Sequence, residues 1–266
     1  MEVKTMLYRT EDLNTFAGIG SSKGVYYKWK DSNYYYKTGT LFFGEFSPLE
    51  PITECICSDI GNLLNVNNIK YDLVKVHKKG NSDFEEQDIL VCRSLNFLND
   101  NEEQFITMRK HYNRKVDYDT IINDFPNFKE LLNQMLIFDF IVNNIDRHYN
   151  NFGYIKNIKT NKVRFAPIFD NGLSLYSMLD IETLKTLKTK PFNKKKYDKA
   201  KPFMNKHYSQ IKLIKELPQI NLDFNDSDIE KILLKYKDVI SKTRIEMIFD
   251  LVKERLHYVR QIYANV

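Results

Sequence analysis

The sequence has little of what marks membrane, disulfide-rich or low-complexity proteins. Its 266 residues include only 9 glycines and 7 prolines, too few for a disordered or repetitive chain. No apolar run approaches the roughly 18–20 residues that a membrane-spanning helix needs, so we expect no transmembrane segment. The first residues, MEVKTMLYRTEDLN, carry charges and lack the apolar block of a secretory signal, which makes the cytoplasm the expected location.

The cysteines are too few and too irregularly spaced for a disulfide framework or a zinc site. Cys55, Cys57 and Cys92 are odd in number and include no C-x-x-C pair. Cys55 and Cys57 lie two residues apart in a predicted helix, so their side chains point in different directions. We therefore expect three buried, chemically inert thiols.

The chain does contain enough apolar residues for a substantial core, and it has a mild excess of positive charge. Hydrophobic residues make up 42% and aromatic residues 14%, which suits one or two folded domains. The net charge is +5, and nine lysines between residues 185 and 206 accompany Asp198 as the sole acidic residue. This segment is either a docking surface for an acidic partner, such as tRNA or nucleotide phosphates, or a solvated mobile stretch. No nucleic-acid-binding motif accompanies it, so direct nucleic-acid binding is not expected.

Residues 1–97 are predicted to form a β-rich lobe with one helix. Aromatic runs such as GVYYKWK and NYYYKTG favour strands, and the Asp31-Ser32 pair between these two runs predicts a hairpin. A stretch with apolar residues at helical spacing favours a helix packed on that sheet. The strand candidates are 24–30, 33–39, 69–76 and 88–95, and the helix candidate is 52–64.

Residues 98–266 are predicted to form a mainly helical lobe, which gives an α+β fold in two lobes. One stretch is apolar nearly all round and predicts a helix buried at the centre of the lobe. Two short strand candidates follow it, and two amphipathic patterns near the C-terminus predict further helices. The helix candidates are 128–142, 229–236 and 245–259, and the strand candidates are 151–156 and 162–169.

Three polar residues after the predicted central helix carry the strongest functional signal. The chain reads NNIDRHYNNFG, then a hairpin, then FAPIFDNG, which places Asp146 five residues before Asn151 and Asp170 at the end of a strand. In a kinase site, one Asp accepts the proton of the substrate hydroxyl, an Asn five residues later binds a metal, and an Asp before a Gly binds the bridging metal. Carboxylate and amide oxygens are the hard ligands that magnesium prefers. The pattern therefore predicts ATP- and Mg²⁺-dependent phosphoryl transfer, with Asp146 catalytic and with Asn151 and Asp170 as metal ligands.

The β-rich lobe supplies candidates for holding the nucleotide. Lys37 ends a predicted strand, where its ammonium can reach the α- and β-phosphates, and Glu54 on the following helix is placed to pair with it. A loop of small residues before the first strand, Gly18 to Gly24, is able to bring backbone N–H groups to phosphate. Val91 to Ser94 is the expected connector for adenine. The expected nucleotide-binding residues are Gly20, Ser21, Ser22, Lys23, Lys37, Val91 and Arg93.

Taken together, these segments resemble the HipA-like serine/threonine kinases, the toxin kinases of bacterial toxin–antitoxin systems, and particularly their compact CtkA-type members. IFDFIVNNIDRHYNNFGYI and RFAPIFDNGLSLY carry the resemblance, and YYYKTG with ITECICSDIGNLL extends it into the first lobe. The resemblance implies a bilobed protein-kinase-like fold with ATP between the lobes, Lys37 on phosphate and Glu54 orienting Lys37. Arg147 and His148 follow the catalytic Asp146 as expected supporting residues, whereas typical eukaryotic protein kinases place His-Arg before that Asp.

The resemblance also implies partners and regulation. Related kinases autophosphorylate serine in the phosphate loop, so phosphate on Ser21 or Ser22 is expected to repel ATP and silence the enzyme. The protein substrate is open, an aminoacyl-tRNA synthetase being one candidate, and an antitoxin partner is a further expectation. Some CtkA-like proteins act outside the cell that makes them, so secretion stays open beside the cytoplasm.

Two other classes of function stay open on the sequence. The pattern Asp-Arg-His-x-x-Asn followed by Asp-x-Gly is also similar to that of phosphoinositide kinases, so the acceptor could be a small molecule or a lipid head group. The lysine-rich segment could face such head groups as well as protein. A non-catalytic nucleotide-binding module, such as a pseudokinase, is the other alternative, and the presence of all five expected functional groups weighs against it.

Overall fold

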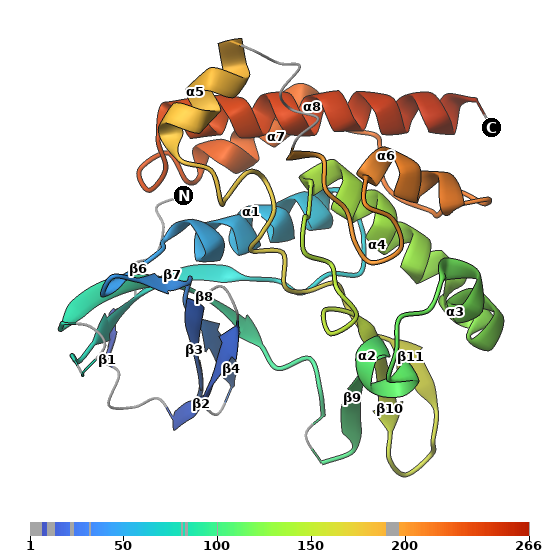
Figure 1. The fold of residues 1–266 in the computed structure, drawn as a ribbon, viewed down its shortest axis with the longest axis horizontal. Coiled ribbons are helices and arrows are strands. Elements are labelled where there is room, and N and C mark those ends of the chain that lie inside the picture. The colour runs from blue at the N-terminus through green and yellow to red at the C-terminus, as the bar shows by residue number, and fades with distance from the viewer. Residues whose placement is uncertain are drawn as a thin grey trace.

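The structure of the chain is a computed structural model (Figure 1). Side chains are described from residue 27 onward, except that of residue 42. The residues described are 7–9, 14–21, 24–31, 33–80, 82, 85–99, 101–189 and 197–265.

The N-terminal part of the described chain is an eight-stranded sheet. Its order is β1-β7-β8-β4-β3-β5-β6, with β2 paired to β3. Its pairings are antiparallel except that of β1 with β7, which is parallel. The strands are β1 (Leu7–Arg9), β2 (Asn14–Ser21), β3 (Gly24–Lys30), β4 (Tyr34–Lys37), β5 (Leu41–Phe42), β6 (Glu45–Phe46), β7 (Asp72–Lys78) and β8 (Gln87–Leu95).

The helix α1, Leu49–Leu63, lies across one face of this sheet, next to β7 and β8 (Figure 1). Successive side chains of a strand point to opposite faces, so Cys92 joins the core under α1 while Val91 joins a separate apolar cluster on the other face. Lys37 is the direct ladder partner of Cys92 and therefore lies on the α1 face of the sheet. The face to which a side chain points therefore decides whether that residue of the sheet can reach the functional site.

The C-terminal part combines a small antiparallel sheet with most of the helices. The sheet has the order β11-β10-β9, with strands β9 (Glu103–Thr107), β10 (Gly153–Asn157) and β11 (Val163–Phe165). The α-helices are α2 (Met108–Tyr112), α3 (Tyr118–Asp124), α4 (Lys129–Val142), α5 (Ile181–Thr189), α6 (His207–Gln210), α7 (Asp226–Leu234) and α8 (Lys242–Ala264). Short 3-10 turns are η2 (Pro126–Phe128) and η4 (Ile211–Leu213).

The two parts share one apolar core. The buried cluster that begins under α1 continues through α4 and into α7 and α8, and α4 is buried on nearly every side. Backbone bonds also cross between the parts, because Ile168 pairs with Asn67 at 2.7 Å and with Ile69 at 2.9 Å. Asn221 donates its Nδ2 to the carbonyl at the end of α1, that of Leu63, at 2.9 Å. The position of α1 against the helical part is therefore fixed by packing and by hydrogen bonds.

The structure agrees with the α+β architecture expected from the sequence. The predicted hairpin, the helix in the first lobe, the buried central helix and the two C-terminal helices are all present, with ends displaced by a few residues. Cys55, Cys57 and Cys92 are buried and unpaired, and burial raises the pKa of each thiol. Within the described ranges, none of the helices combines the length and the apolar character needed to cross a membrane.

Five strands were not expected: β1, β2, the two-residue strands β5 and β6, and β9. β1 pairs in parallel with β7, and β9 adds a third strand to the hairpin of β10 and β11. Both are short, and each is stabilised by pairing with a strand distant in sequence, which a local pattern does not reveal. The segment with Gly18 and Gly20, expected as a loop, is part of β2, because its backbone pairs with β3 up to Ser21 and Gly24.

Candidate active site

A tight loop begins where α4 ends. Asn143 has φ of 53°, a left-handed conformation that ends the helix, and its N–H donates to the last helical carbonyls. The next residue, Asn144, accepts the N–H of Asp146 on its Oδ1 at 2.9 Å, a turn that Asn side chains favour. The carbonyl of Asp146 accepts the N–H of His148 at 2.7 Å and Nδ2 of Asn151 at 3.1 Å. The loop from Asp146 to Asn151 is therefore closed by its own hydrogen bonds.

Arg147 is buried inside this loop and joins it to two other segments. Its guanidinium meets both carboxylate oxygens of Asp139 on α4 at 2.9 Å, and neither side chain has exposed surface. It also donates to the carbonyl of Asn151 at 3.0 Å, to the carbonyl of Phe169, and to Oδ1 of Asn171 at 2.5 Å. One side chain thus holds α4, the 146–151 loop and the residues on either side of Asp170 together.

Asp170 lies at the meeting point of the two lobes. It has φ of 59°, a left-handed conformation that is uncommon for residues other than glycine but that Asp tolerates. Its Oδ1 forms a close ion pair with Nζ of Lys37, which comes from the end of β4. Burial by itself would raise the pKa of Asp170, but the ammonium of Lys37 lowers this pKa well below its usual value. The carboxylate is therefore held in its ionised form.

Glu54 of α1 completes the ion pair. Its Oε1 lies 2.8 Å from Nζ of Lys37, so the pairing expected from the sequence is present, and Glu54 has no exposed surface. The other oxygen, Oε2, accepts the N–H of Asn171 at 2.8 Å. Burial would lower the pKa of Lys37, but the carboxylates of Asp170 and Glu54 raise it well above its usual value. Glu54 thereby couples α1 to the segment that carries Asp170.

The donor set of Asn151 and Asp170 fits magnesium. The amide of Asn151 is held through its nitrogen, and no described residue donates to its Oδ1. Among the residues that the structure describes, no group of three or more His, Cys, Asp or Glu side chains forms a metal site. A pair of protein oxygens suits Mg²⁺, which usually keeps several waters and takes further oxygens from substrate phosphates.

Asp146 contacts a lysine that the sequence analysis did not single out. Nζ of Lys201 lies 2.6 Å from Oδ1 of Asp146, and Nε2 of His148 lies 3.8 Å from Oδ2. Lys201 belongs to the lysine-rich segment, which was interpreted from the sequence either as a docking surface or as a solvated stretch. Neither interpretation is sufficient for this residue, because its ammonium is in contact with the predicted catalytic carboxylate.

The turn that carries Lys201 is held by a buried side chain. Gln210 has no exposed surface, accepts the N–H groups of Phe203 at 3.1 Å and Met204 at 3.2 Å, and donates to the carbonyl of Lys201 at 2.8 Å. The ring of Phe203 packs edge-on against that of Tyr149, with centroids 6.2 Å apart. The backbone of Lys201 is therefore fixed beside the loop.

A second lysine faces the site from β3. Lys28 is the direct ladder partner of Lys37. Its pKa is lowered, first by burial and then by the charge of Lys37, while Asp170 and Glu54 act in the opposite sense. Like charges directly opposite each other destabilise a strand pair. Two lysines in this arrangement suit a site that binds several negative charges.

The expected adenine connector, Val91 to Ser94, lies within β8. Val91 and Arg93 lie inside β8, which is paired with β4 on one side and β7 on the other. Arg93 pairs with residues of both neighbouring strands and Val91 pairs with Val74 of β7, and both side chains lie on the face away from Lys37. Arg93 instead stacks over the ring of Tyr34, 4.5 Å from its centroid. The chain leaves the sheet only after Leu95.

The residues expected to contact phosphate through a loop are only partly described. Gly20 and Ser21 lie at the end of β2, which pairs with β3. Ser22 and Lys23 lie outside the described residues. The described backbone thus has a strand where a loop was expected, paired with β3 up to Ser21 and Gly24.

Comparisons with known proteins show the fold. No protein-family model matches the chain, and no curated protein matches it. The crystal structure of the Helicobacter pylori proinflammatory kinase CtkA is similar over 94% of each chain, with a TM-score of 0.62 and 16% identity. HipA from Shewanella oneidensis MR-1, in its complex with HipB and operator DNA, matches 93% of this chain and 63% of its own, with a TM-score of 0.46 and 10% identity. Fam20 from hydra matches 91% and 81%, with a TM-score of 0.46 and 13% identity. The chain therefore has a bilobed kinase fold like that of CtkA, as the sequence predicted.

Loss of Arg147 should destabilise the protein strongly. We expect Arg147→Met to lower the free energy of unfolding by about 3–5 kcal/mol, because it leaves the carboxylate of Asp139 buried without a partner. The double variant Asp139→Leu with Arg147→Met removes both charges and should regain most of that stability. Urea unfolding of the three proteins measures both effects. A single variant as stable as the wild type would contradict the role that we assign to Arg147.

Proposed function

We propose that the chain is an ATP- and Mg²⁺-dependent protein serine/threonine kinase of the HipA-like type. Residues 1–97 bind the phosphates of the nucleotide, and residues 98–266 supply the catalytic loop and the metal ligands. The observation that supports this proposal best is the convergence of Lys37, Glu54 and Asp170, three distant parts of the chain, beside a loop with the Asp-x-x-x-x-Asn spacing. A kinase requires the pair of lysine and helix glutamate and the metal-binding Asp to be in place together.

The concentration of buried charge favours a functional site over a purely structural one. Burying ion pairs costs desolvation free energy, and apolar residues of similar size often stabilise a protein equally well. Lys28, Lys37, Glu54 and Asp170 nevertheless gather at one place, and the pKa values of Lys28, Lys37 and Asp170 are displaced. Strongly displaced pKa values with specific charge partners are typical of functional sites. In the proposal, both lysines bind phosphate oxygens.

Each residue has a defined part in the proposed reaction. The hydroxyl oxygen of a serine or threonine attacks the γ-phosphorus, and the bond from that phosphorus to the β–γ bridging oxygen breaks, so ADP leaves with the electron pair. The hydroxyl proton passes to the carboxylate of Asp146. Asn151 and Asp170 would hold Mg²⁺, which when bound neutralises charge on the phosphate oxygens. Lys201 keeps Asp146 in position and brings its ammonium close to the transferred group.

Transfer of labelled γ-phosphate tests the proposal. With Mg²⁺ and labelled ATP, the protein should label itself or added casein on serine or threonine, and mass spectrometry should locate the label. Asp146→Asn and Asp170→Asn should each lower the rate about 100-fold or more, because the first removes the proton acceptor and the second removes a carboxylate ligand of Mg²⁺. Lys185→Ala, a change of an exposed lysine on α5, is the control and should keep the wild-type rate.

Label on Ser21 or Ser22 would identify the expected regulatory site. ATP binding without transfer to any protein would contradict the proposal and favour a small-molecule kinase.

Lys201 should affect turnover more than nucleotide binding. We expect Lys201→Ala to lower kcat on the order of 100-fold with the KM for ATP nearly unchanged, because the lost charge acts on Asp146 and the transferred group. Lys201→Arg keeps a positive charge at the same place and should retain more activity than Lys201→Ala. Steady-state kinetics with casein provides both constants. An unchanged or increased kcat in Lys201→Ala would show that the contact with Asp146 does not assist the reaction.

A further inference from the structure

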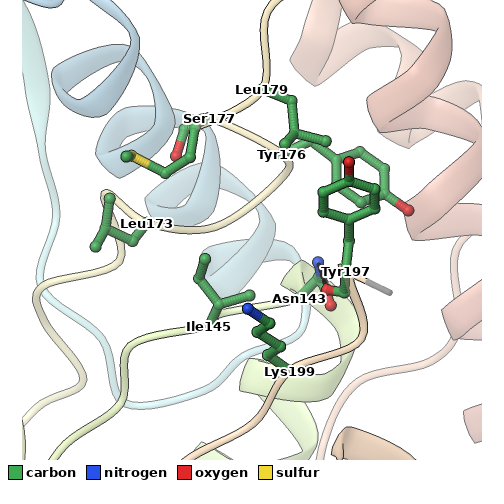
Figure 2. A pocket seen from close by; sticks show the side chains of 9 residues that line it. Asn143, Ile145, Leu173, Tyr176, Ser177, Leu179, Tyr197 and Lys199 are labelled. Atoms are coloured by element: carbon green, nitrogen blue, oxygen red, sulfur yellow. Dashed lines mark hydrogen bonds between the residues drawn. The ribbon is translucent and has the colours of Figure 1, made fainter. Parts of the chain in front are cut away.

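A cavity of about 200 Å³ opens beside the catalytic loop. Three segments form its walls: the start of the loop at Asn143 and Ile145, a stretch between residues 173 and 179, and the residues from Tyr197 to Lys199. Figure 2 shows the side chains of these segments arranged around the open space, with Lys199 beside Ile145. The N–H of Ile145 donates to the carbonyl of Leu173 at 3.2 Å, so two of the three walls are tied together.

The cavity lies next to the carboxylate that we propose as the proton acceptor. Ile145 directly precedes Asp146, and Lys199 lies two residues before Lys201, whose ammonium contacts Asp146 at 2.6 Å. Consecutive Cα atoms are about 3.8 Å apart, so these two walls lie only one and two residue lengths from Asp146 and Lys201. The acceptor hydroxyl must sit beside the carboxylate of Asp146. An extended peptide advances about 3.3 Å per residue. A side chain one to three residues away from that hydroxyl can therefore reach the cavity.

The amide of Asn143 and the hydroxyl of Ser177 are already used by the protein itself. Asn143 donates to the carbonyl of Tyr197 at 3.3 Å and accepts from Arg255 at 3.1 Å. Ser177 donates its hydroxyl to the carbonyl of Gly172 at 2.7 Å. The remaining lining is mainly aliphatic and aromatic, with the exposed side chain of Met178 at the edge. A hydrogen-bonding ligand would find few partners here, whereas an apolar group would find close contacts.

The size of the cavity suits one side chain rather than a free small molecule. Sites for drug-sized ligands and cofactors usually have volumes of about 300–1,000 Å³. A cavity of roughly 150 Å³ lined by apolar residues is known to accept benzene. About 200 Å³ therefore accommodates an aromatic ring or a branched aliphatic side chain and is too small for a nucleotide.

The rim of the cavity is positively charged. Lys199 lines the cavity and is exposed, and no described carboxylate lies within ion-pair distance of its ammonium. Asp198, the sole acidic residue of the lysine-rich segment, is buried and paired with Arg255 at 2.8 Å. The carboxylate next to Lys199 in sequence therefore does not neutralise it. An acidic residue of a bound segment is the complementary partner for this rim.

We propose that this cavity receives a bulky apolar side chain from the phosphorylated segment of the protein substrate, and that Lys199 pairs with an acidic residue of the same segment. The inference rests on the proposed protein kinase activity and states which acceptor sequences that activity favours: a serine or threonine with a large apolar residue within three positions and an acidic residue close by. The apolar contact supplies most of the discrimination, since pairing at an exposed rim contributes little by itself.

A serine-centred peptide library, in which one position at a time is fixed as Leu, Phe, Ala, Asp or Lys, tests this inference with Mg-ATP. At one position within three residues of the serine, kcat/KM should be about 10-fold or more higher for Leu or Phe than for Ala. Met178→Trp fills the cavity from an exposed position and should abolish this preference. Lys199→Glu should replace the preference for Asp in the peptide by a preference for Lys. Lys185→Glu changes an exposed lysine of the same lysine-rich segment outside the cavity and should keep both preferences.

A binding measurement separates docking from transfer. With ¹³C-methyl methionine in the protein, the preferred peptide should shift the methyl resonance of Met178 in the absence of ATP, and the peptide with Ala at the apolar position should not. Two results would overturn the inference and leave the proposed function intact. One is phosphate transfer to peptides without any apolar preference, and the other is a preference that Met178→Trp and Lys199→Glu leave unchanged. Absence of transfer to every peptide and protein, together with no shift at Met178, would overturn both.

Discussion

The buried pair of Arg147 and Asp139 is the interaction on which the rest of the site depends. A guanidinium with no exposed surface is costly to desolvate, so its retention requires partners for its N–H groups, and the structure supplies them from three segments. Asp139 is part of the central helix, the carbonyl of Asn151 belongs to the loop, and Phe169 and Asn171 lie on either side of the proposed metal ligand. The loop and the metal-binding segment are therefore positioned relative to each other by one side chain anchored in the core.

A second set of charges connects this arrangement to the β-rich part. Glu54 binds the ammonium of Lys37 with one oxygen and the backbone beside Asp170 with the other, so a single carboxylate on α1 joins both lobes. Lys28 and Lys37 then face each other across two strands, a repulsive arrangement that the anions of a bound nucleotide would relieve. On the far side of the loop, Lys201 balances Asp146. Positive and negative groups thus alternate in the site, where phosphate and metal have to be bound and a proton has to be accepted.

Local patterns predicted the helices α1, α4, α7 and α8 and the spacing of Asp146 and Asn151, because both depend on residues adjacent in sequence. The helices α2, α3, α5 and α6 were not predicted. Contacts between distant segments were harder to predict. Lys201 reaches the loop across more than 50 residues, which its own lysine-rich surroundings do not reveal. Lys28 is identified only when the register of the hairpin is known, since the register alone sets it opposite Lys37. Val91 was expected in the connector that hydrogen-bonds adenine, but it pairs with Val74 inside β8 and its side chain joins the apolar cluster on the other face of the sheet.

Calorimetric titration with ATP, with and without Mg²⁺, tests most directly that these residues form a nucleotide and metal site. The account predicts that the wild type binds ATP at least about 10-fold more tightly with Mg²⁺ than with EDTA, a difference of about 1.4 kcal/mol. Asp170→Asn should lose this dependence on Mg²⁺, and Asp223→Asn, a change at an exposed position far along the chain, should retain it. Equal affinity with and without Mg²⁺ in the wild type, or an Mg²⁺ effect unchanged in Asp170→Asn, would contradict the assignment of the site.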